Sequence, residues 1–309
     1  MQASNILILG AGFVGAHLHR TLANSHRAVE LVSSAACDLT QADQVEDALR
    51  NCDSSTTVVM TAAVSRLRDN SYAGFSLNVL MAEKLSEGLR RKSVRNVVFL
   101  SSVDVYGLLE EGQTIHEGLP LRPDDYYAMS KVVSEFILTK SCRAQRTPLA
   151  ILRLTGVYGP GDSARSTMWH LTQSAFVQGT ISVYGDGRDE RDFVLVEDVA
   201  RVISCESVAP HNHVLNIATG TSLTIMEIAQ IIARTVPCRI EQAAATRETT
   251  HPARAKVMRF DIAKLKGDFP EFEACPPTAL PEGIRRYLDD WTRVPDDRSL
   301  PPGTGDGVG

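Results

Sequence analysis

The stretch NILILGAGFVG, residues 5–15, decides the fold of this 309-residue chain. It begins with a short, uninterrupted apolar run, which is typical of a strand buried on both faces. The pattern GxGxxG follows, and a segment with apolar residues at helical spacing comes next. In this context GxGxxG predicts a dinucleotide site, because glycines let the backbone approach a pyrophosphate and the helix N-terminus offers free N–H groups. We therefore expect five residues of this turn to bind a dinucleotide: Gly10, Gly12, Phe13, Val14 and Gly15.

The same alternation of apolar runs and helical segments continues along the chain. Strands are predicted at 28–33, at a brief run ending at 37–38, and at 56–63, 96–102 and 149–159. Helices are predicted at 43–50, 70–91, 126–143 and 224–235. Apolar strands that alternate with helices indicate a parallel sheet covered on both faces. The predicted fold class is α/β, with a Rossmann-type doubly wound parallel sheet and a smaller mixed α/β substrate lobe.

The rhythm changes after about residue 160, where glycine-rich and polar stretches separate shorter elements. We expect a dinucleotide-binding domain at 1–160, with 190–215 returning to it, and a second lobe at 161–189 and 216–298. Residues 299–309 have almost nothing to bury and are expected to be a disordered tail.

Composition argues against several kinds of partner. The net charge of −5 and the lack of a basic stripe argue against nucleic acid. No apolar run approaches the ~20 residues that cross a bilayer, and no export signal precedes the first strand, so we expect a cytoplasmic protein without a membrane partner. Six scattered cysteines without a CxxC pair fit reduced thiols. His211 and His213 have no third ligand near them in the sequence, so no metal site is expected.

The segment YYAMSK places Tyr127 four residues before Lys131, so that both side chains project from one helix face. A tyrosine with a pKa of about 10 is a poor base at neutral pH. A nearby ammonium and a positive nicotinamide ring would favour the phenolate and lower that pKa. The preceding strand ends in Ser101 and Ser102, where ligands of doubly wound sheets lie. A serine, a tyrosine and a lysine there would form a proton-transfer site for hydride exchange between an alcohol and a ketone.

The residues after the second strand bear on the choice of dinucleotide. NAD sites usually have an acid there to hold the adenine ribose, whereas this chain has Ser33 and Ser34. Two small hydroxyls would bind a 2′-phosphate or leave room for it. The sequence therefore favours NADP over NAD, and both stay open.

Taken together, the motifs resemble the extended short-chain dehydrogenases/reductases of the nucleotide-sugar epimerase, dehydratase and reductase group. The resemblance runs from about residue 5 to 291. Its motifs, in chain order, are GAGFVG, MTAAVS, SLNVLMAEKL, LSSVDVYG, YAMSK, LRLTGVYGPGD, VYGDGRDERDFVLVEDVA and LNIATG. The resemblance implies a nucleotide-sugar substrate.

The resemblance also implies roles for single residues. Ser102, Tyr127 and Lys131 match the catalytic serine, the general acid/base and the lysine that holds the nicotinamide ribose. Besides the glycine turn and the catalytic pair, cofactor-binding residues are expected at Ser33, Ser34, Asp38, Leu39, Ala62 and Ala63. Substrate-binding residues are expected at Val64, Ser65, Asn78, Asp104, Gly156, Arg191 and Arg254. Three alternatives stay open: a buried structural amide for Asn78, a surface ion pair for Arg191, and Lys256 in place of Arg254.

Two departures from the group narrow the reaction. Val103 stands where the 4,6-dehydratases usually have an acid, which argues against dehydration. Asp104 stands where the GDP-fucose synthases have a cysteine, and no histidine clearly occupies their second position, which argues against 3,5-epimerisation.

Three functions remain open, with the first favoured because its motifs match over more of the chain. A nucleotide-sugar 4-epimerase removes hydride from C4 and returns it to the other face through a 4-keto intermediate. A 4-ketoreductase delivers hydride once, from NADPH. A dinucleotide-binding sensor or regulator without catalysis is the third, and the retained serine, tyrosine and lysine argue against it. Relatives often form a homodimer through the helices equivalent to 70–91 and 126–143, and we expect one here.

Overall fold

The computed structural model describes residues 5–23, 28–107, 109–110, 112–162, 166–244 and 257–293. At its centre lies a six-stranded sheet in the order β11-β6-β4-β3-β1-β2, in which all neighbouring strands are parallel. The strands are β1 (Asn5–Leu9), β2 (Val29–Val32), β3 (Thr56–Met60), β4 (Asn96–Ser102), β6 (Leu149–Leu154) and β11 (His213–Ile217). The predicted α/β class with a Rossmann-type parallel sheet is confirmed.

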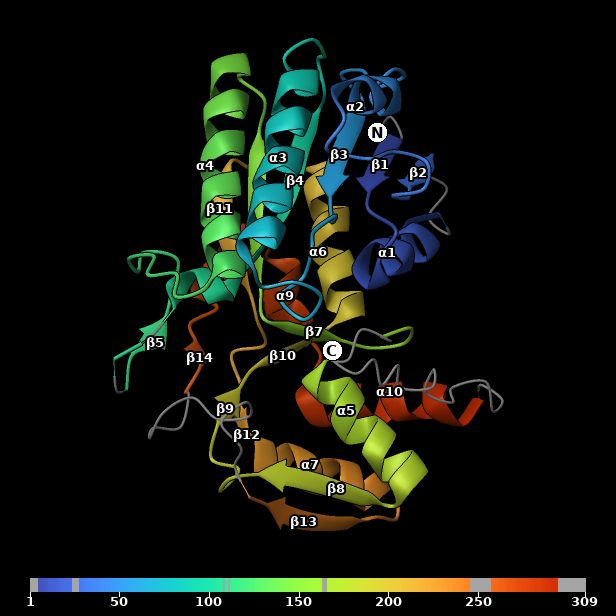
Figure 1. Ribbon diagram of the computed structural model, residues 1–309, viewed down its shortest axis with the longest axis vertical. Helices are drawn as coiled ribbons and strands as arrows, with labels where there is room; N and C mark the ends of the chain where they lie inside the picture. The colour runs from blue at the N-terminus through green and yellow to red at the C-terminus, as the bar shows by residue number, and fades with distance from the viewer. Residues whose placement is uncertain are drawn as a thin grey trace, which may run out of the picture.

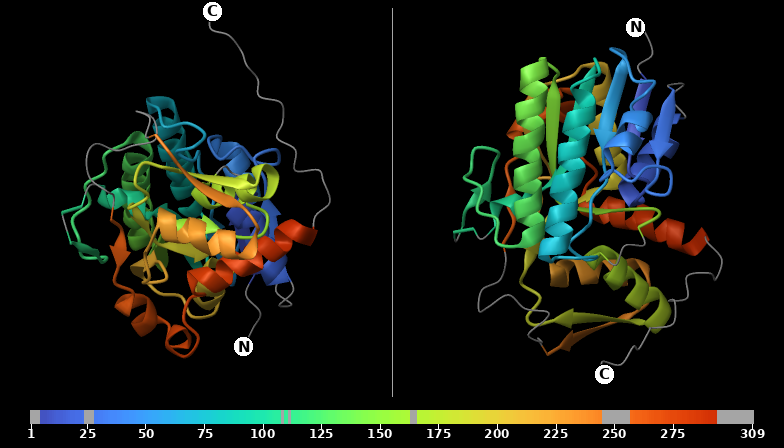
Figure 2. Two further views of the ribbon diagram at one scale, coloured as in Figure 1. Left: turned by 90° about the horizontal axis from the view of Figure 1, so that it is seen from below. Right: turned by 45° about the horizontal axis from the view of Figure 1, so that its top comes forward.

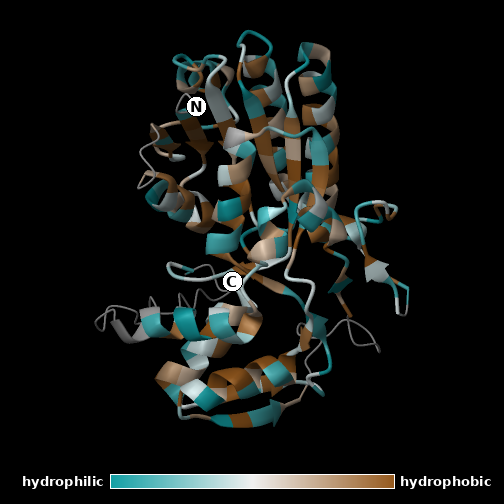
Figure 3. Cartoon of the chain, turned by 180° about the vertical axis from the view of Figure 1, so that it is seen from behind, coloured by the Kyte–Doolittle hydropathy of each residue, from teal (hydrophilic) through white to brown (hydrophobic). Residues whose placement is uncertain are grey.

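Helices cover both faces of this sheet (Figure 1). One face carries α2 (Ala42–Ala48), α3 (Tyr72–Leu89) and α4 (Tyr126–Gln145), and the other carries α1 (Phe13–Ala23), α6 (Val196–Val208), α8 (Ala263–Asp268) and α9 (Glu271–Ala274). Alternate side chains of β1 enter the two cores: Ile6 and Ile8 pack with α1 and α6, Leu7 and Leu9 with α2 to α4. Burial on both faces explains why the strands are mostly apolar (Figure 3).

Two predicted strands differ from the structure. The predicted strand ending at 37–38 is wrong: residues 34–36 form a turn, in which the N–H groups of Ala36 and Cys37 both donate to the Ser33 carbonyl at 3.0 Å. The predicted strand at 149–159 is two strands, β6 and β7 (Gly156–Tyr158). β7 leaves the sheet to pair with β10 (Phe193–Leu195), which a continuous apolar pattern does not reveal.

The second lobe lies beyond the edge at which the strands end, as Figures 1 and 2 show. It contains α5 (Thr167–Gln173), η2 (Ser174–Gln178), β8 (Thr180–Tyr184), α7 (Ile225–Thr235), β13 (Arg239–Ala243) and α10 (Leu280–Arg293). β8 pairs with β13, and β9 (Glu190–Arg191) pairs with β12 (Leu223–Thr224). The lobe has its own apolar core, to which Tyr158, Ile181, Ile228 and Ile284 contribute.

Two segments that the predicted boundaries assign wholly or partly to the second lobe belong to the domain of the central sheet. β11 joins the central sheet beside β6, so the boundary predicted after residue 215 falls inside a strand. Leu265, Phe269 and Phe272, predicted in the lobe, pack into the core beneath the sheet. Helices as short as α8 and α9 carry too little periodicity to show which core they join.

A few short elements and general features complete the fold. β5 (Thr114–Ile115) pairs with β14 (Arg259–Phe260), and η1 (Val103–Tyr106) is a turn of 3₁₀ helix after β4. All six cysteines are free. Within the described ranges, no helix combines the length and apolarity that a membrane span requires.

Candidate active site

The glycine turn connects β1 to α1 as predicted, and packing within the chain accounts for two of its glycines. Gly10 has φ +116°, and a Cβ there would lie 2.6 Å from the Ala62 nitrogen. A Cβ on Gly15 would lie 1.9 Å from the Gly10 carbonyl oxygen. Because both contacts are with backbone that cannot move aside, these glycines hold α1 close to the sheet.

Gly12 differs, because a Cβ there would meet nothing within 4 Å. No neighbour among the described residues therefore requires glycine at this position. The open side of Gly12 lies at the N-terminus of α1, where free N–H groups attract anions. These residues fit a dinucleotide pyrophosphate, whose close approach to the backbone would account for Gly12.

The segment after β3 lies against this turn. The Thr61 hydroxyl donates to the Gly10 carbonyl at 2.7 Å, and the N–H groups of Thr61 and Ala62 donate to the Leu9 carbonyl at 3.0 and 2.9 Å. The structure thus places the predicted residues Ala62 and Ala63 directly beside the glycine turn.

The predicted adenine end follows β2, whose Val32 carbonyl accepts a hydrogen bond from the Gly10 N–H at 2.9 Å. Ser33 is half-buried there, and Ser34 and Asp38 are exposed. The Asp38 carboxylate accepts bonds from the Thr40 N–H and hydroxyl at 2.9 and 2.7 Å, which lower its pKa. Leu39, by contrast, is buried in the core, so its side chain points away from a surface ligand.

Helix α4 presents the predicted pair Tyr127 and Lys131. Its first turn is capped by the Asp125 side chain, which accepts a hydrogen bond from the Ala128 N–H at 2.7 Å. The Lys131 ammonium lies 5.7 Å from the centre of the Tyr127 ring and donates to the Leu100 carbonyl at 2.8 Å. The predicted common helix face is confirmed, and the lysine is held at the end of β4.

Ser102 completes the group at the end of β4. Its side chain lies close enough to that of Tyr127 to lower the tyrosine pKa, and its hydroxyl accepts from the Asp104 N–H at 3.1 Å. The structure therefore brings together the three predicted catalytic residues, which lie 25 and 29 positions apart in the sequence (Ser102 to Tyr127, and Ser102 to Lys131).

Burial controls the protonation of this pair. It raises the pKa of Tyr127 well above the ordinary value, with Asp104 acting in the same direction and the Ser102 side chain opposing it. Burial lowers the pKa of Lys131 to about 8, against the opposing effect of Glu135. We predicted that Lys131 and a positive nicotinamide ring together would lower the pKa of Tyr127. In the protein without a cofactor, burial has the larger effect and raises this pKa. A further positive charge at this face is needed to favour the phenolate.

Two arginines from different lobes lie near Asp104. Arg66 Nη1 is 3.6 Å from Asp104 Oδ1 and 3.9 Å from Asp125 Oδ2. Arg191, on β9, pairs with Asp189 at 2.6 Å. The charges of Arg66 and Asp104 also affect the pKa of Arg191. Sequence reasoning predicted Arg191 but did not single out Arg66, because only the folded loop after β3 brings Arg66 to this edge.

Asn78 is held by both ends of its amide. Its Oδ1 accepts from the Val64 N–H at 2.8 Å, and its Nδ2 donates to the Val64 carbonyl and to the Ser130 hydroxyl, each at 3.0 Å. The side chain is 4% exposed. These contacts favour the alternative interpretation, a buried structural amide that fixes the loop carrying Val64 and Ser65 against α4.

The remaining predicted substrate residues divide into two cases. A Cβ on Gly156 would lie 2.6 Å from the Phe193 ring, so the pairing of β7 with β10 accounts for this glycine. Arg254 and its alternative Lys256 lie outside the described residues.

A buried polar network behind Lys131 was not predicted from the sequence. Glu135 receives two bonds from Arg153, at 2.7 and 3.0 Å, and one from the Ser101 hydroxyl at 2.6 Å. Arg153 also donates to the Tyr106 hydroxyl at 3.0 Å, which donates to Asn216 at 2.8 Å. The network ties α4 to β4, β6 and β11, and its only sequence signal was charged residues within apolar segments.

Comparisons with known proteins agree with this geometry. A family model described as the NAD dependent epimerase/dehydratase family matches residues 6–218. A putative UDP-glucose 4-epimerase of Methanocaldococcus jannaschii is 27% identical, over 91% of this chain and 95% of the relative. An uncharacterized UDP-glucose epimerase of Bacillus subtilis is 26% identical, over 52% of this chain and half of the relative's own length.

Solved structures show the same fold. The UDP-glucose 4-epimerase of Thermus thermophilus, in complex with NAD, superposes with a TM-score of 0.80 at 24% identity, over 94% of this chain and 99% of that one. The Pseudomonas aeruginosa protein RMD, complexed with NADPH, gives a TM-score of 0.77 at 24% identity, over 94% and 99% of the two chains. The chain belongs to the NAD dependent epimerase/dehydratase family, whose members are nucleotide-sugar enzymes of the extended short-chain dehydrogenase/reductase type.

Proposed function

We propose that this chain is an NAD(P)-dependent nucleotide-sugar 4-epimerase. The observation that carries the proposal is the meeting of Ser102, Tyr127 and Lys131 at the edge where the strands end, between the glycine turn and the second lobe. These residues would move one proton at a sugar hydroxyl, while a bound nicotinamide supplies the acceptor and donor of hydride.

Each residue has a distinct task in this reaction. Tyr127, as phenolate, takes the proton from the C4 hydroxyl as the C4 hydride leaves, and gives it back when hydride returns to the opposite face. Ser102 donates a hydrogen bond to the oxygen as it changes between alcohol and ketone. Lys131 binds the nicotinamide ribose and holds positive charge beside the phenolate.

Arg66 and Arg191 would bind the diphosphate of the substrate. They come from the two lobes, and a guanidinium offers paired donors to phosphate oxygens. Before substrate arrives, Asp104 and Asp189 partly neutralise them, so binding exchanges carboxylate partners for phosphate.

Dehydration is disfavoured on the same geometry. Val103 is 4% exposed and packs in an apolar cluster, which leaves Asp104 as the carboxylate of η1 beside Tyr127. Elimination of water needs both an extra acid and an extra base.

A 4-ketoreductase is the second candidate, and the residues after β2 favour it. Ser33 and the exposed Ser34 stand where an acid would select NAD. As a ketoreductase, the chain would take a 4-keto sugar nucleotide as substrate and hydride from NADPH.

One purification and one isotope experiment separate the two candidates. The chain is purified without added cofactor and denatured, and the released dinucleotide is identified. Retained NAD supports the epimerase, because the hydride is then borrowed and returned within one turnover. Transfer of deuterium from [4-²H]NADPH to C4 of a 4-keto sugar nucleotide, by a chain that purifies empty, would replace the epimerase with the ketoreductase.

A further inference from the structure

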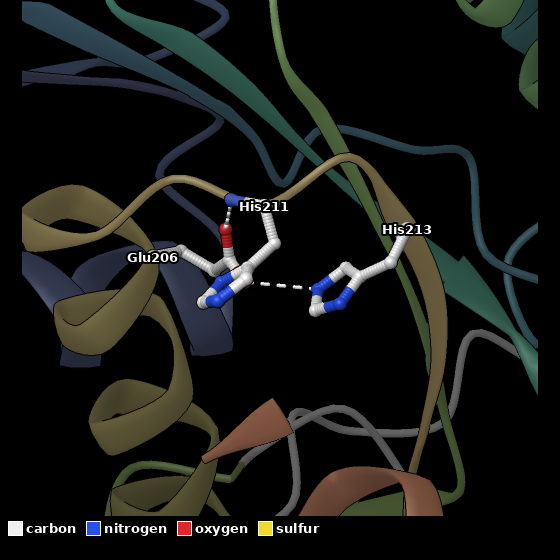
Figure 4. A group of neighbouring side chains, drawn as sticks. All are labelled: Glu206, His211 and His213. Atoms are coloured by element: carbon white, nitrogen blue, oxygen red, sulfur yellow. Dashed lines mark hydrogen bonds and ion pairs between the residues drawn. The ribbon is translucent and has the colours of Figure 1, made fainter. Parts of the chain in front are cut away.

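Glu206, His211 and His213 form a cluster at the opposite end of the sheet from the active site (Figure 4). His213 opens β11, and Ile217 ends it at the level of Leu154, the partner of Ser102 in the sheet. Four residues of strand separate these levels, a distance of about 13 Å along the sheet. The cluster is therefore a separate site, and nothing about it depends on the function proposed above.

Three ligand atoms, one from each side chain, all lie within 4.8 Å of one another. His213 Nε2 is 2.9 Å and His211 Nδ1 is 3.2 Å from the same oxygen, Glu206 Oε1. Ligand atoms of a tetrahedral zinc site are about 3.3 Å apart, given metal–ligand bonds of about 2 Å. Sequence reasoning expected no metal here for want of a third ligand, and the fold supplies it from the last turn of α6.

The hydrogen bonding of His213 leaves one ring nitrogen for a cation. Asp268 Oδ2 lies 2.6 Å from its Nδ1 and Glu206 Oε1 lies 2.9 Å from its Nε2, so each ring nitrogen faces a carboxylate oxygen. His213 is 8% exposed, and Nε2 makes no hydrogen bond of acceptable geometry despite its closeness to Oε1. A proton on Nε2 would not point at that oxygen, whereas a larger cation between the ligand atoms would satisfy both. A carboxylate on the far nitrogen is also the usual support of a metal-bound histidine.

The surroundings suit a metal with an open position. The Glu206 side chain is fully buried, and its Oε2 accepts the His211 N–H at 3.0 Å, so the carboxylate is fixed. The His211 side chain is 36% exposed, which gives an ion an entrance and leaves room for water as a fourth ligand. Two imidazoles and a carboxylate are a donor set that Zn²⁺ prefers and Mg²⁺ does not.

We propose that Glu206, His211 and His213 bind one divalent transition-metal ion, with Zn²⁺ as the fitting metal and Asp268 orienting His213. The ion would join the end of α6 to the start of β11 and, through Asp268, to α8. Its role is structural, because the site lies at the amino edge of the sheet.

The test is a zinc titration of the intact chain after removal of metal with a chelator. We expect one equivalent of Zn²⁺ to bind by calorimetry and to raise the melting temperature, whereas Mg²⁺ does neither. His211→Ala removes a half-exposed ligand and should weaken zinc binding at least ~100-fold, and Asp268→Asn should weaken it about 10- to 100-fold. His116→Ala, at an exposed histidine elsewhere, should change nothing.

A Co²⁺ spectrum distinguishes metal binding at this cluster from metal binding at the free cysteines. Co²⁺ at this site should give visible bands of tetrahedral nitrogen and oxygen coordination without thiolate charge-transfer bands. The proposal is overturned if the unmodified chain binds no stoichiometric zinc, if His211→Ala binds it as tightly, or if the cobalt spectrum shows thiolate ligands.

Discussion

At the scale of single residues, burial shifts the pKa values of both Tyr127 and Lys131 in the candidate active site. The raised pKa of Tyr127 keeps its phenol protonated, and the pKa of about 8 at Lys131 brings the loss of its charge close to neutral pH. Both effects come from burial. A bound ligand must therefore add the positive charge that stabilises the Tyr127 phenolate, so that proton transfer by Tyr127 depends on the bound cofactor.

Tyr127→Phe tests the role of the phenol. We expect turnover to fall about 10²- to 10⁴-fold, because the proton of the sugar hydroxyl loses its acceptor, while dinucleotide binding persists. Steady-state kinetics and a fluorescence titration with NAD(P)H measure the two. Tyr126→Phe, which removes the same atom from the exposed neighbour, should leave both unchanged. Full turnover in Tyr127→Phe would contradict the role of the phenol as acid and base, whereas dinucleotide binding without any turnover in the unmodified chain would support a sensor.

Lys131→Met tests the cost of the buried ammonium. The pKa of Lys131 falls from 10.5 to about 8 on folding, so below pH 8 the folded state carries a charge that burial disfavours. Methionine should raise the free energy of unfolding by about 1–3 kcal/mol at pH 7. That gain should shrink as the pH rises above 8 and vanish above 10.5, where both states are neutral.

Urea unfolding at several pH values measures this difference, and turnover should be lost in the same variant. Lys140→Met, at an exposed lysine of the same helix, should show neither the gain nor its pH dependence. An equal gain in both variants would refute burial as the cause.

Local patterns predicted the catalytic residues but not their environment. The common face of Tyr127 and Lys131 follows from helix geometry. The strand end indicated Ser101 or Ser102, and the family resemblance selected Ser102. Arg66 could not be inferred, because a loop residue acquires its place only when the chain around it has folded. The effect of burial on the tyrosine pKa could not be inferred either, because burial is a property of the whole fold; the predicted lowering by Lys131 together with a nicotinamide ring stays a prediction.

At the scale of elements, the turn between β1 and α1 separates two reasons for a glycine. Gly15 is needed by the fold, since its Cβ would strike the Gly10 carbonyl, whereas Gly12 borders open space. Sequence patterns give both the same letter in GxGxxG. Only the packing shows that Gly15 is required by its neighbours in the chain and that Gly12 is not.

A matched pair of alanine variants tests this division. Gly15→Ala should lower the free energy of unfolding by about 3 kcal/mol, because the helix must move away from the sheet. Gly12→Ala should leave stability unchanged within about 0.5 kcal/mol and weaken NAD(P)H binding at least about tenfold. Thermal unfolding and fluorescence titration report the two effects. Unchanged binding in Gly12→Ala would remove the pyrophosphate from this turn.

The elements that sequence reasoning misplaced share a physical cause. The expected strand at Cys37 became a turn because the Ser33 carbonyl accepts two backbone N–H groups there, an arrangement that apolar content does not encode. β7, which follows Leu154, pairs with β10 from a distant segment and does not extend the central sheet. Long helices such as α3 and α4 were predicted to within a few residues, because the spacing of their apolar residues reflects which side of each helix is buried.

At the scale of the whole molecule, α3 and α4 run side by side (Figures 1 and 2), and the pair exposes several large apolar and aromatic side chains. Its exposed large side chains are Tyr72, Leu77, Tyr126, Met129 and Phe136. On the two helices expected to form the dimer, Phe136 is exposed and Leu80 and Ile137 are half-buried. The predicted homodimer would bury the exposed side chains of this pair.

Phe136→Glu tests the dimer. Light scattering after gel filtration should give twice the mass of the chain for the unmodified protein and the single mass for this variant, because a buried unpaired carboxylate opposes association. Phe136 and Val177 are 63% and 64% exposed, so Val177→Glu, in the lobe, is the matched control and should stay dimeric. A single mass for the unmodified chain would contradict the dimer.

The core of the second lobe unites residues from far apart in the chain: Tyr158 on β7 packs with Ile284 and Tyr287 on α10. The first four strands of the sheet, by contrast, are complete by Ser102. During synthesis, the cofactor half has its framework when two thirds of the chain are still to come. The lobe must wait until α10 has left the ribosome, so a nascent chain would have the strands beside the glycine turn long before its place for the sugar.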